Sequence, residues 1–245
     1  MIALAFSPDE IVFYEWGFFK LNATIVYTWV VMAVLVVGSW LVTRRLSSGP
    51  KVSRWQNLLE VVVNFLRNEI RGLSQQNPDL YLPFIGTLFL FIAVSNILDV
   101  VPGFTAPTGS LSTTVALAIC VFVAVPIYGV ANQGVGSYLK NYIKPSPFML
   151  PFNIIGELSR TLALAVRLFG NVMSGTKVAT IMVSLVPLVV PTVMQALGLL
   201  IGLIQAYIFA VLAMVYIAAG MRRREAPPQG SPDVPSETAT EKGSI

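Results

Sequence analysis

The sequence predicts an all-α polytopic membrane protein. Apolar residues make up 55% of its 245 residues and charged residues only 11%, whereas a soluble domain carries about 25% charge. Several apolar stretches reach the roughly 20 residues that a spanning helix needs. The chain has no histidine, one cysteine and a net charge of +4. This composition disfavours most metal sites, excludes a disulfide within the chain and gives no indication of nucleic-acid binding.

Five hydrophobic segments follow one another along the chain. Their approximate ranges are 22–42, 81–101, 112–130, 148–183 and 192–219. The fourth is too long for one upright helix, at about 1.5 Å per residue across about 30 Å of hydrocarbon, so it must be tilted, bent or partly interfacial. Pro187 and Pro191 break the chain after it. The fourth and fifth segments are therefore predicted to form a long tilted helical hairpin.

A separate amphipathic helix is predicted between the first two segments, at about 54–73. Its apolar residues recur at helical spacing, at Trp55, Leu58, Leu59, Val62, Phe65, Leu66 and Ile70. The pattern indicates a helix lying on the membrane surface. A surface helix packed on a soluble domain is the alternative, but no soluble domain is evident.

Basic residues follow the first, third and fifth segments, and by the positive-inside rule those ends are cytoplasmic. This predicts an outer-side N-terminal segment at 1–20 and a membrane domain at 21–221. Residues 222–245 are rich in Pro, Ser, Glu and Thr without apolar periodicity, which is typical of a disordered cytoplasmic tail. The N-terminus then lies outside and the C-terminus inside.

Arg167 is the most informative residue of the chain, because it lies inside the apolar run LALAVRLFGNVMSG. A guanidinium stays charged at any ordinary pH, and placing one near a bilayer centre costs roughly 3 kcal/mol on insertion scales. Such a residue normally faces a protein interior or a wet cavity and acts on ions or charged partners. The alternative is an arginine at a helix end that extends to the membrane surface.

Two amide side chains are predicted to lie near this charge. Gln205 follows the Pro187 turn by 18 residues and Arg167 precedes it by 20, so a hairpin would bring them to a similar depth. A guanidinium donor and an amide oxygen could then pair, although a buried glutamine often bonds backbone instead. Asn171 is one turn after Arg167 on the same helix face, where it could line a wet path or bond a neighbouring helix.

Other polar residues form two further groups. Glu157 and Arg160 precede Arg167 by ten and seven residues, and they could pair with each other at i, i+3. Alternatively, Glu157 lines the cytoplasmic approach to Arg167. Asn96 and Asp99 flank the turn after the second segment, where they could line an aqueous vestibule or belong to an ordinary polar turn.

Motifs for covalent chemistry are absent from the sequence. It has no nucleotide-binding loop, no GxSxG and no paired catalytic carboxylates. We therefore expect no catalytic residue, no metal and no bound cofactor, and a chemistry that is electrostatic.

The chain resembles subunit a of F-type ATP synthases over about Trp55 to Ala219. The resemblance is carried by ELSRTLALAVRLFGNVMSG, VSLVPLVVP, IQAYIFAVLAMVYIA and SNILDVVPGFTAPTGSLSTTVALA. It implies a non-catalytic, ion-translocating stator subunit in a bacterial plasma (inner) membrane. Its implied partners are a rotating c-subunit ring, which the helical hairpin would face, b-type subunits of the peripheral stalk, and the rest of the complex.

The resemblance also implies roles for individual residues. In the family, the arginine that matches Arg167 faces the ring, and two offset half-channels pass H⁺ or Na⁺ to and from the ring carboxylates. Asn171 and Gln205 match polar positions near that arginine. Asn96 and Asp99 match polar positions of the half-channel that opens to the outer side.

Two positions depart from the family pattern. Many members carry an acidic residue nine positions after the arginine, where this chain has Thr176, and some carry a histidine seven positions before the glutamine, where it has Gly198. Either Glu157 or Asp99 substitutes for the missing group, or the ion is Na⁺, which needs no titratable relay; the sequence slightly favours Na⁺.

Two other classes of protein are alternatives. The first is a stand-alone secondary transporter that uses Arg167 to bind an anionic substrate. Such transporters often contain internal repeats, and the sequence shows none. The second is a structural membrane anchor, which gives no reason to hold Arg167 in a bilayer.

Overall fold

The computed structural model describes residues 12–16, 19–44, 54–73, 77–101, 103–136, 149–185 and 190–222. Its helices are α1 (Ala23–Thr43), α2 (Arg54–Leu73), α3 (Leu82–Leu98), α4 (Leu111–Gln133), α6 (Met149–Leu185) and α7 (Val190–Arg222). The predicted all-α polytopic fold is confirmed. The turn at Pro187 and the tail beyond Arg222 lie outside the described residues. The predicted break at Pro187 and the predicted disordered tail are therefore untested.

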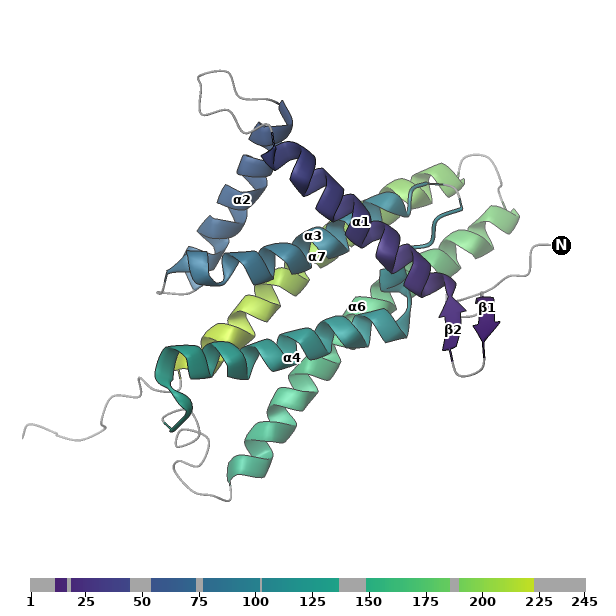
Figure 1. The fold of residues 1–245 in the computed structure, drawn as a ribbon. Coiled ribbons are helices and arrows are strands. Elements are labelled where there is room, and N and C mark those ends of the chain that lie inside the picture. Colours follow the sequence, from purple (N-terminus) through teal and green to yellow (C-terminus); the bar gives the residue numbers. More distant parts are fainter. Residues whose placement is uncertain are drawn as a thin grey trace, which may run out of the picture.

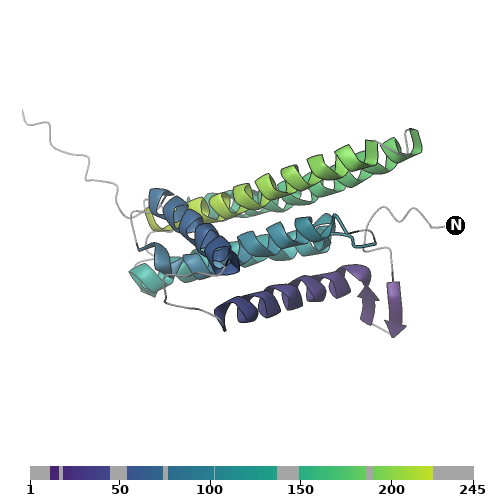
Figure 2. The same cartoon turned by 90° about the horizontal axis from the view of Figure 1, so that it is seen from above.

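The helices form three layers (Figures 1 and 2). Seen from above, α1 makes one outer layer, α3 and α4 make the middle layer, and α6 and α7 lie together in the other outer layer. The helix α2 crosses the layers at one end of the molecule. The α6–α7 layer therefore has one face against α3 and α4 and one face directed away from the rest of the described chain.

Helix lengths agree with a membrane-spanning arrangement. Among the described residues, α1, residues 111–132 of α4 and residues 192–220 of α7 are long and apolar enough to cross a membrane. The apolar helix α3 is shorter, at 17 residues, or about 26 Å. With 37 residues, α6 would be about 55 Å long, which agrees with the prediction that it cannot stand upright within one bilayer.

The core lies between the middle layer and the α6–α7 layer. Fully buried side chains include Ile85 and Ile92 of α3, Leu168 of α6 and Phe209 of α7. On α7 many of the buried residues are small, as at Gly202, Ala206, Ala210 and Ala213. Small side chains let helix backbones approach closely, which is the usual basis of packing between membrane helices.

The amphipathic helix α2 divides its apolar side between two environments. Leu66 and Ile70 are buried against the helical core, whereas Leu58 and Val61 are more than half exposed. The phenol of Tyr207 on α7 donates to Oε2 of Glu69 at 3.2 Å. The fold therefore attaches one side of α2 to α7 and leaves the other side free, as expected of a helix at a membrane surface.

The N-terminal part contains an element that the sequence analysis did not foresee. Strand β1 (Val12–Trp16) pairs antiparallel with β2 (Phe19–Asn22), and α1 begins directly after β2. The predicted N-terminal segment is thus partly a hairpin. Strands of four and five residues are too short to give a clear alternating pattern.

Candidate functional site

Arg167 lies on the outward side of α6. Its neighbours Leu164 and Leu168 are buried in the core, whereas Arg167 itself is exposed. The helical repeat of 3.6 residues explains this division, because the residues three before and one after Arg167 turn toward α7 and α4. Within the described part of the chain, no hydrogen bond or ion pair engages the guanidinium. No described residue of the chain therefore neutralises its charge.

The surface around Arg167 is apolar. Exposed large hydrophobic residues extend along both helices, at Ile155, Leu158, Leu162, Val166 and Ile181 of α6 and at Val193, Leu197, Leu200, Ile201 and Ile204 of α7. A contiguous apolar surface of this kind contacts either lipid or another protein. A single cation within such a surface is costly to leave against lipid.

Asn171 and Gln205 connect α6 to α7 near this charge. Nδ2 of Asn171 donates to Oε1 of Gln205 at 2.6 Å, and Gln205 is only 1% exposed. The sequence predicted that Gln205 lies beside the Arg167 region of α6, and it does. Its hydrogen-bond partner, however, is Asn171, one helical turn beyond Arg167. The buried Nε2 of Gln205 has no hydrogen-bond partner among the residues that the structure describes.

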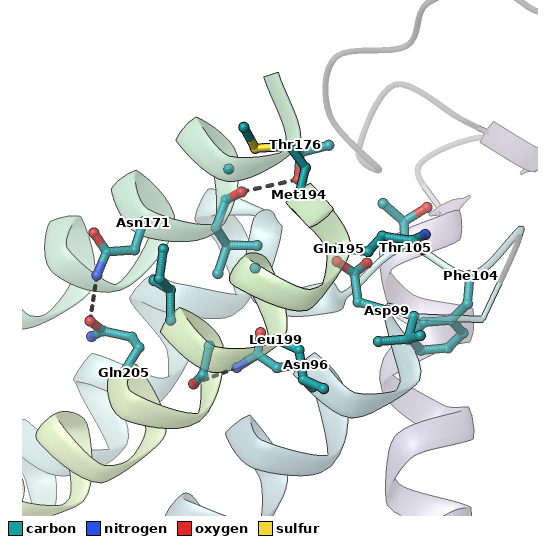
Figure 3. Close-up of a pocket in the computed structure, with 16 residues that line it drawn as sticks. Asn96, Asp99, Phe104, Thr105, Asn171, Thr176, Met194, Gln195, Leu199 and Gln205 are labelled. Atoms are coloured by element: carbon teal, nitrogen blue, oxygen red, sulfur yellow. Dashed lines mark hydrogen bonds between the residues drawn. The ribbon is translucent and has the colours of Figure 1, made fainter. Parts of the chain in front are cut away.

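A cavity of about 310 Å³ opens beside this contact. Figure 3 shows Asn171 and Gln205 at one end of it and Asp99, Phe104, Thr105 and Gln195 toward the other, with Asn96 between. The predicted site residues Asn96, Asp99, Asn171, Thr176 and Gln205 all line it. It also contains Gly198, so both departures from the family pattern lie in the same cavity.

The turn after α3 forms the wall of the cavity farthest from Gln205. The backbone N–H of Ala106 donates to Oδ1 of Asp99 at 2.8 Å, which closes the turn. Tyr27 of α1 donates to the carbonyl of Gly103 at 3.0 Å and packs its ring on Phe104. The turn is thus held from inside by Asp99 and from outside by α1.

A second, much smaller cavity lies toward the other end of α6. It has a volume of about 20 Å³ and is lined by Glu157, Arg160, Thr161 and Tyr216 together with residues of α4 and α7. Space of that size holds about one water molecule. The structure therefore brings Glu157 and Arg160 to one polar recess, and their mutual pairing stays a prediction.

Arg167 lies between the two cavities along α6. The last residue of α6 in the smaller cavity is Thr161 and the first in the larger is Asn171, about 15 Å apart along the helix axis. Arg167 lines neither cavity. A permanent cation thus lies between the two cavities in position along α6. It is on the outward side of the helix, whereas the larger cavity is also lined by α3 and the smaller one by α4.

Sequence reasoning missed two residues of this site. Gln195 lines the larger cavity, and Gly202 approaches Asn96 there. In the sequence, Gly198 and Gly202 lie four residues apart in an otherwise apolar segment, and this spacing is typical of close helix packing. That pattern predicts a close contact without naming its partner.

Comparison with known proteins identifies the family of the chain. The family model described as ATP synthase A chain matches residues 25–218. The chain is 63% identical to "ATP synthase subunit a 2" of Acaryochloris marina over 213 residues, which are 87% of this chain and 91% of that protein. It is 59% identical to "ATP synthase subunit a" of Albidiferax ferrireducens over 223 residues, covering 91% of this chain and 96% of the relative.

The apolar helices and these relatives define an integral membrane protein of the polytopic helical class. The chain belongs to the ATP synthase A chain family.

Proposed function

We propose that this chain is the ion-translocating stator subunit of a rotary F-type ATP synthase or ATPase. The position of Arg167 between two polar cavities, on an outward apolar surface, supports this most directly. The larger cavity would be part of the half-channel from the outer side, and the smaller one part of the half-channel from the cytoplasm. A ring of c subunits would pass along the α6–α7 face and carry ions from one to the other.

Arg167 would act as an electrostatic gate in this arrangement. A guanidinium close to a ring carboxylate favours the ionised form and lowers its pKa, so the carboxylate releases its cation there. A carboxylate that moves on into lipid must first bind a cation again, because a bare charge is expensive in hydrocarbon. A fixed positive charge between the half-channels also repels cations that would cross directly. Ion flow then requires rotation of the ring.

The two cavities suggest different access routes. The larger cavity could hold about ten waters at roughly 30 Å³ each, and Asp99 and Asn96 line it. The smaller one, with Glu157 and Arg160, holds about one. We therefore propose a wet outer half-channel and a narrow cytoplasmic one that is completed only when the ring is in place.

The transported ion is H⁺ or Na⁺, and the lining of the larger cavity slightly favours Na⁺. Thr176 and Gly198 occupy the positions at which many family members carry titratable groups. Without those groups the cavity offers hydroxyl, amide and backbone oxygens with one carboxylate, Asp99, among its described lining residues. Oxygen ligands and water suit a hydrated Na⁺, which needs no proton relay.

The proposed function also assigns partners and orientation. The subunit would lie in a bacterial plasma membrane with its N-terminus outside and its C-terminus in the cytoplasm. The c-ring would contact the α6–α7 face, and b-type subunits of the peripheral stalk would hold the subunit against rotation. The rest of the ATP synthase complex would supply the catalytic chemistry.

Arg167→Ala tests this proposal in vesicles that carry the whole complex. ATP-driven uptake is measured with and without Na⁺ and with a protonophore. We expect the variant to lose uptake while the complex stays assembled, whereas Arg71→Ala, an exposed arginine on α2, should transport normally. Uptake that needs Na⁺ and survives the protonophore would identify Na⁺ as the ion. Normal uptake in Arg167→Ala would overturn the proposal and favour a secondary transporter.

A further inference from the structure

Asn96 makes an unusual contact with the middle of α7. Its Nδ2 donates to the backbone carbonyl of Gly202 at 3.0 Å, and both the hydrogen bond and the Asn96 side chain are buried. A helical carbonyl has two lone pairs, so it can accept this bond in addition to its bond within the helix. Figure 3 shows the contact at the floor of the larger cavity, beside Leu199.

The contact depends on the absence of a side chain at position 202. A Cβ there would lie 2.7 Å from Cγ of Asn96 and 2.8 Å from its Cβ, closer than real Cβ atoms approach other atoms. By contrast, a Cβ at Gly198, one turn earlier on α7, would meet nothing within 4 Å. The close approach is therefore specific to Gly202.

Gly202 lies one turn before Gln205 on α7, and Gln205 bonds Asn171 on α6. Asn171 in turn lies one turn after Arg167. A continuous set of contacts thus runs from Asn96 on α3 through α7 to the part of α6 that carries the fixed charge. Because packed helices shift as units, the height of α7 against α3 sets the position of Gln205 opposite Asn171.

We propose that Asn96 and Gly202 form a positioning clamp that sets α7 so that Gln205 holds Asn171 beside Arg167. This is a role for Asn96 in addition to lining the cavity, and it rests on the proposed function of Arg167. The donor Nδ2 and the missing Cβ at 202 are both required. A carboxylate at position 96 would still line the cavity but could not donate to the Gly202 carbonyl.

The first test exchanges the sizes of the two residues in the whole complex, with ATP-driven ion uptake into vesicles as the measurement. Gly202→Ala should reduce uptake by about three- to tenfold, as much as loss of the Gln205 amide, because it misplaces that group. Added to Asn96→Gly, which removes the clashing atoms together with the donor, Gly202→Ala should cause little further loss, so that the double variant stays within about threefold of Asn96→Gly alone. Added to Asn96→Ala, it should still cause a further loss, because the Cβ at position 96 stays 2.8 Å from the new methyl carbon. Undiminished uptake in Gly202→Ala, or an equal further loss in the Asn96→Gly background, would overturn the clamp.

A second measurement separates positioning from blockage of the cavity. In a Gln205→Leu background, Gly202→Ala should add less than about a twofold loss, because the residue that it misplaces has already been removed. If the loss of uptake caused by Gly202→Ala is as large in the Gln205→Leu background as in the wild type, the substitution acts by another route. That result would overturn the positioning role.

A third variant covers the case in which Gly202→Ala does not assemble. Asn96→Asp adds no bulk and keeps an oxygen toward the cavity, yet it lacks the donor. We expect it to lose as much uptake as Asn96→Ala, and uptake at the wild-type level would overturn the clamp. Arg167→Ala is measured in parallel. Normal uptake in Arg167→Ala would overturn the proposed function itself. If Arg167→Ala loses uptake while Gly202→Ala and Asn96→Asp stay fully active, only the clamp is overturned.

Discussion

Asn171 donates a hydrogen bond to Gln205 at 2.6 Å and thereby joins α6 to α7 one helical turn beyond Arg167. The bond uses the amide oxygen of Gln205, so that oxygen is committed to Asn171 rather than to the guanidinium. Arg167 keeps its five donors free of described partners within the subunit. The amide pair therefore fixes the helix that carries the charge while the charge itself points outward.

Gln205→Leu should weaken this arrangement without destroying it. The change removes one hydrogen bond, worth about 0.5–1.5 kcal/mol, and leaves the charge of Arg167 in place. We expect ATP-driven ion uptake by the assembled complex to fall about three- to tenfold. Asn171→Leu should give a similar loss, and the double variant should be little worse than either single one. Complete loss in assembled Gln205→Leu would show that Gln205 acts directly on the ion or the ring.

Several features of this fold were predictable from the sequence because each depends on local composition. The predicted range 54–73 coincides with α2 (Arg54–Leu73), since apolar residues at helical spacing define both its face and its ends. Arg167 stood out because a charge in an apolar run is costly wherever the helix packs. The larger cavity was predictable only as a polar region near Asn96 and Asp99, because its volume depends on how side chains from three helices meet.

Other features required the structure itself. Counting residues from the Pro187 turn could not distinguish Arg167 from Asn171 as the partner of Gln205, because the two are one turn, about 5.4 Å, apart on α6. In the sequence alone, a glycine inside a helix, such as Gly202, could mark a flexible point, a kink or a close contact with a neighbouring helix. Only the position of Asn96 shows that here it permits a close contact.

Gly103→Ala should destabilise the turn that borders the larger cavity. Gly103 has φ +90°, a left-handed conformation that costs a residue with a Cβ about 1–2 kcal/mol. Its carbonyl also accepts the Tyr27 bond from α1. Thermal unfolding of the purified complex should show the loss, whereas Gly38→Ala, in a helix with open space around it, should be neutral or slightly stabilising. Equal behaviour of the two variants would mean that the turn can relax.

Thr176→Glu tests whether the larger cavity is filled with water. Thr176 is exposed and lines the cavity, and its hydroxyl is bonded to the carbonyl of Val172. A glutamate there would extend into a space of about 310 Å³, where water could solvate its charge. We therefore expect uptake to fall by less than about threefold, well under 1.4 kcal/mol of barrier. Thr176→Leu, of similar reach but apolar, should reduce uptake more because it removes water from the route. A sharp fall in Thr176→Glu with the complex still assembled would instead mean that this position packs against a neighbouring subunit, and the wet outer half-channel would then have to lie elsewhere.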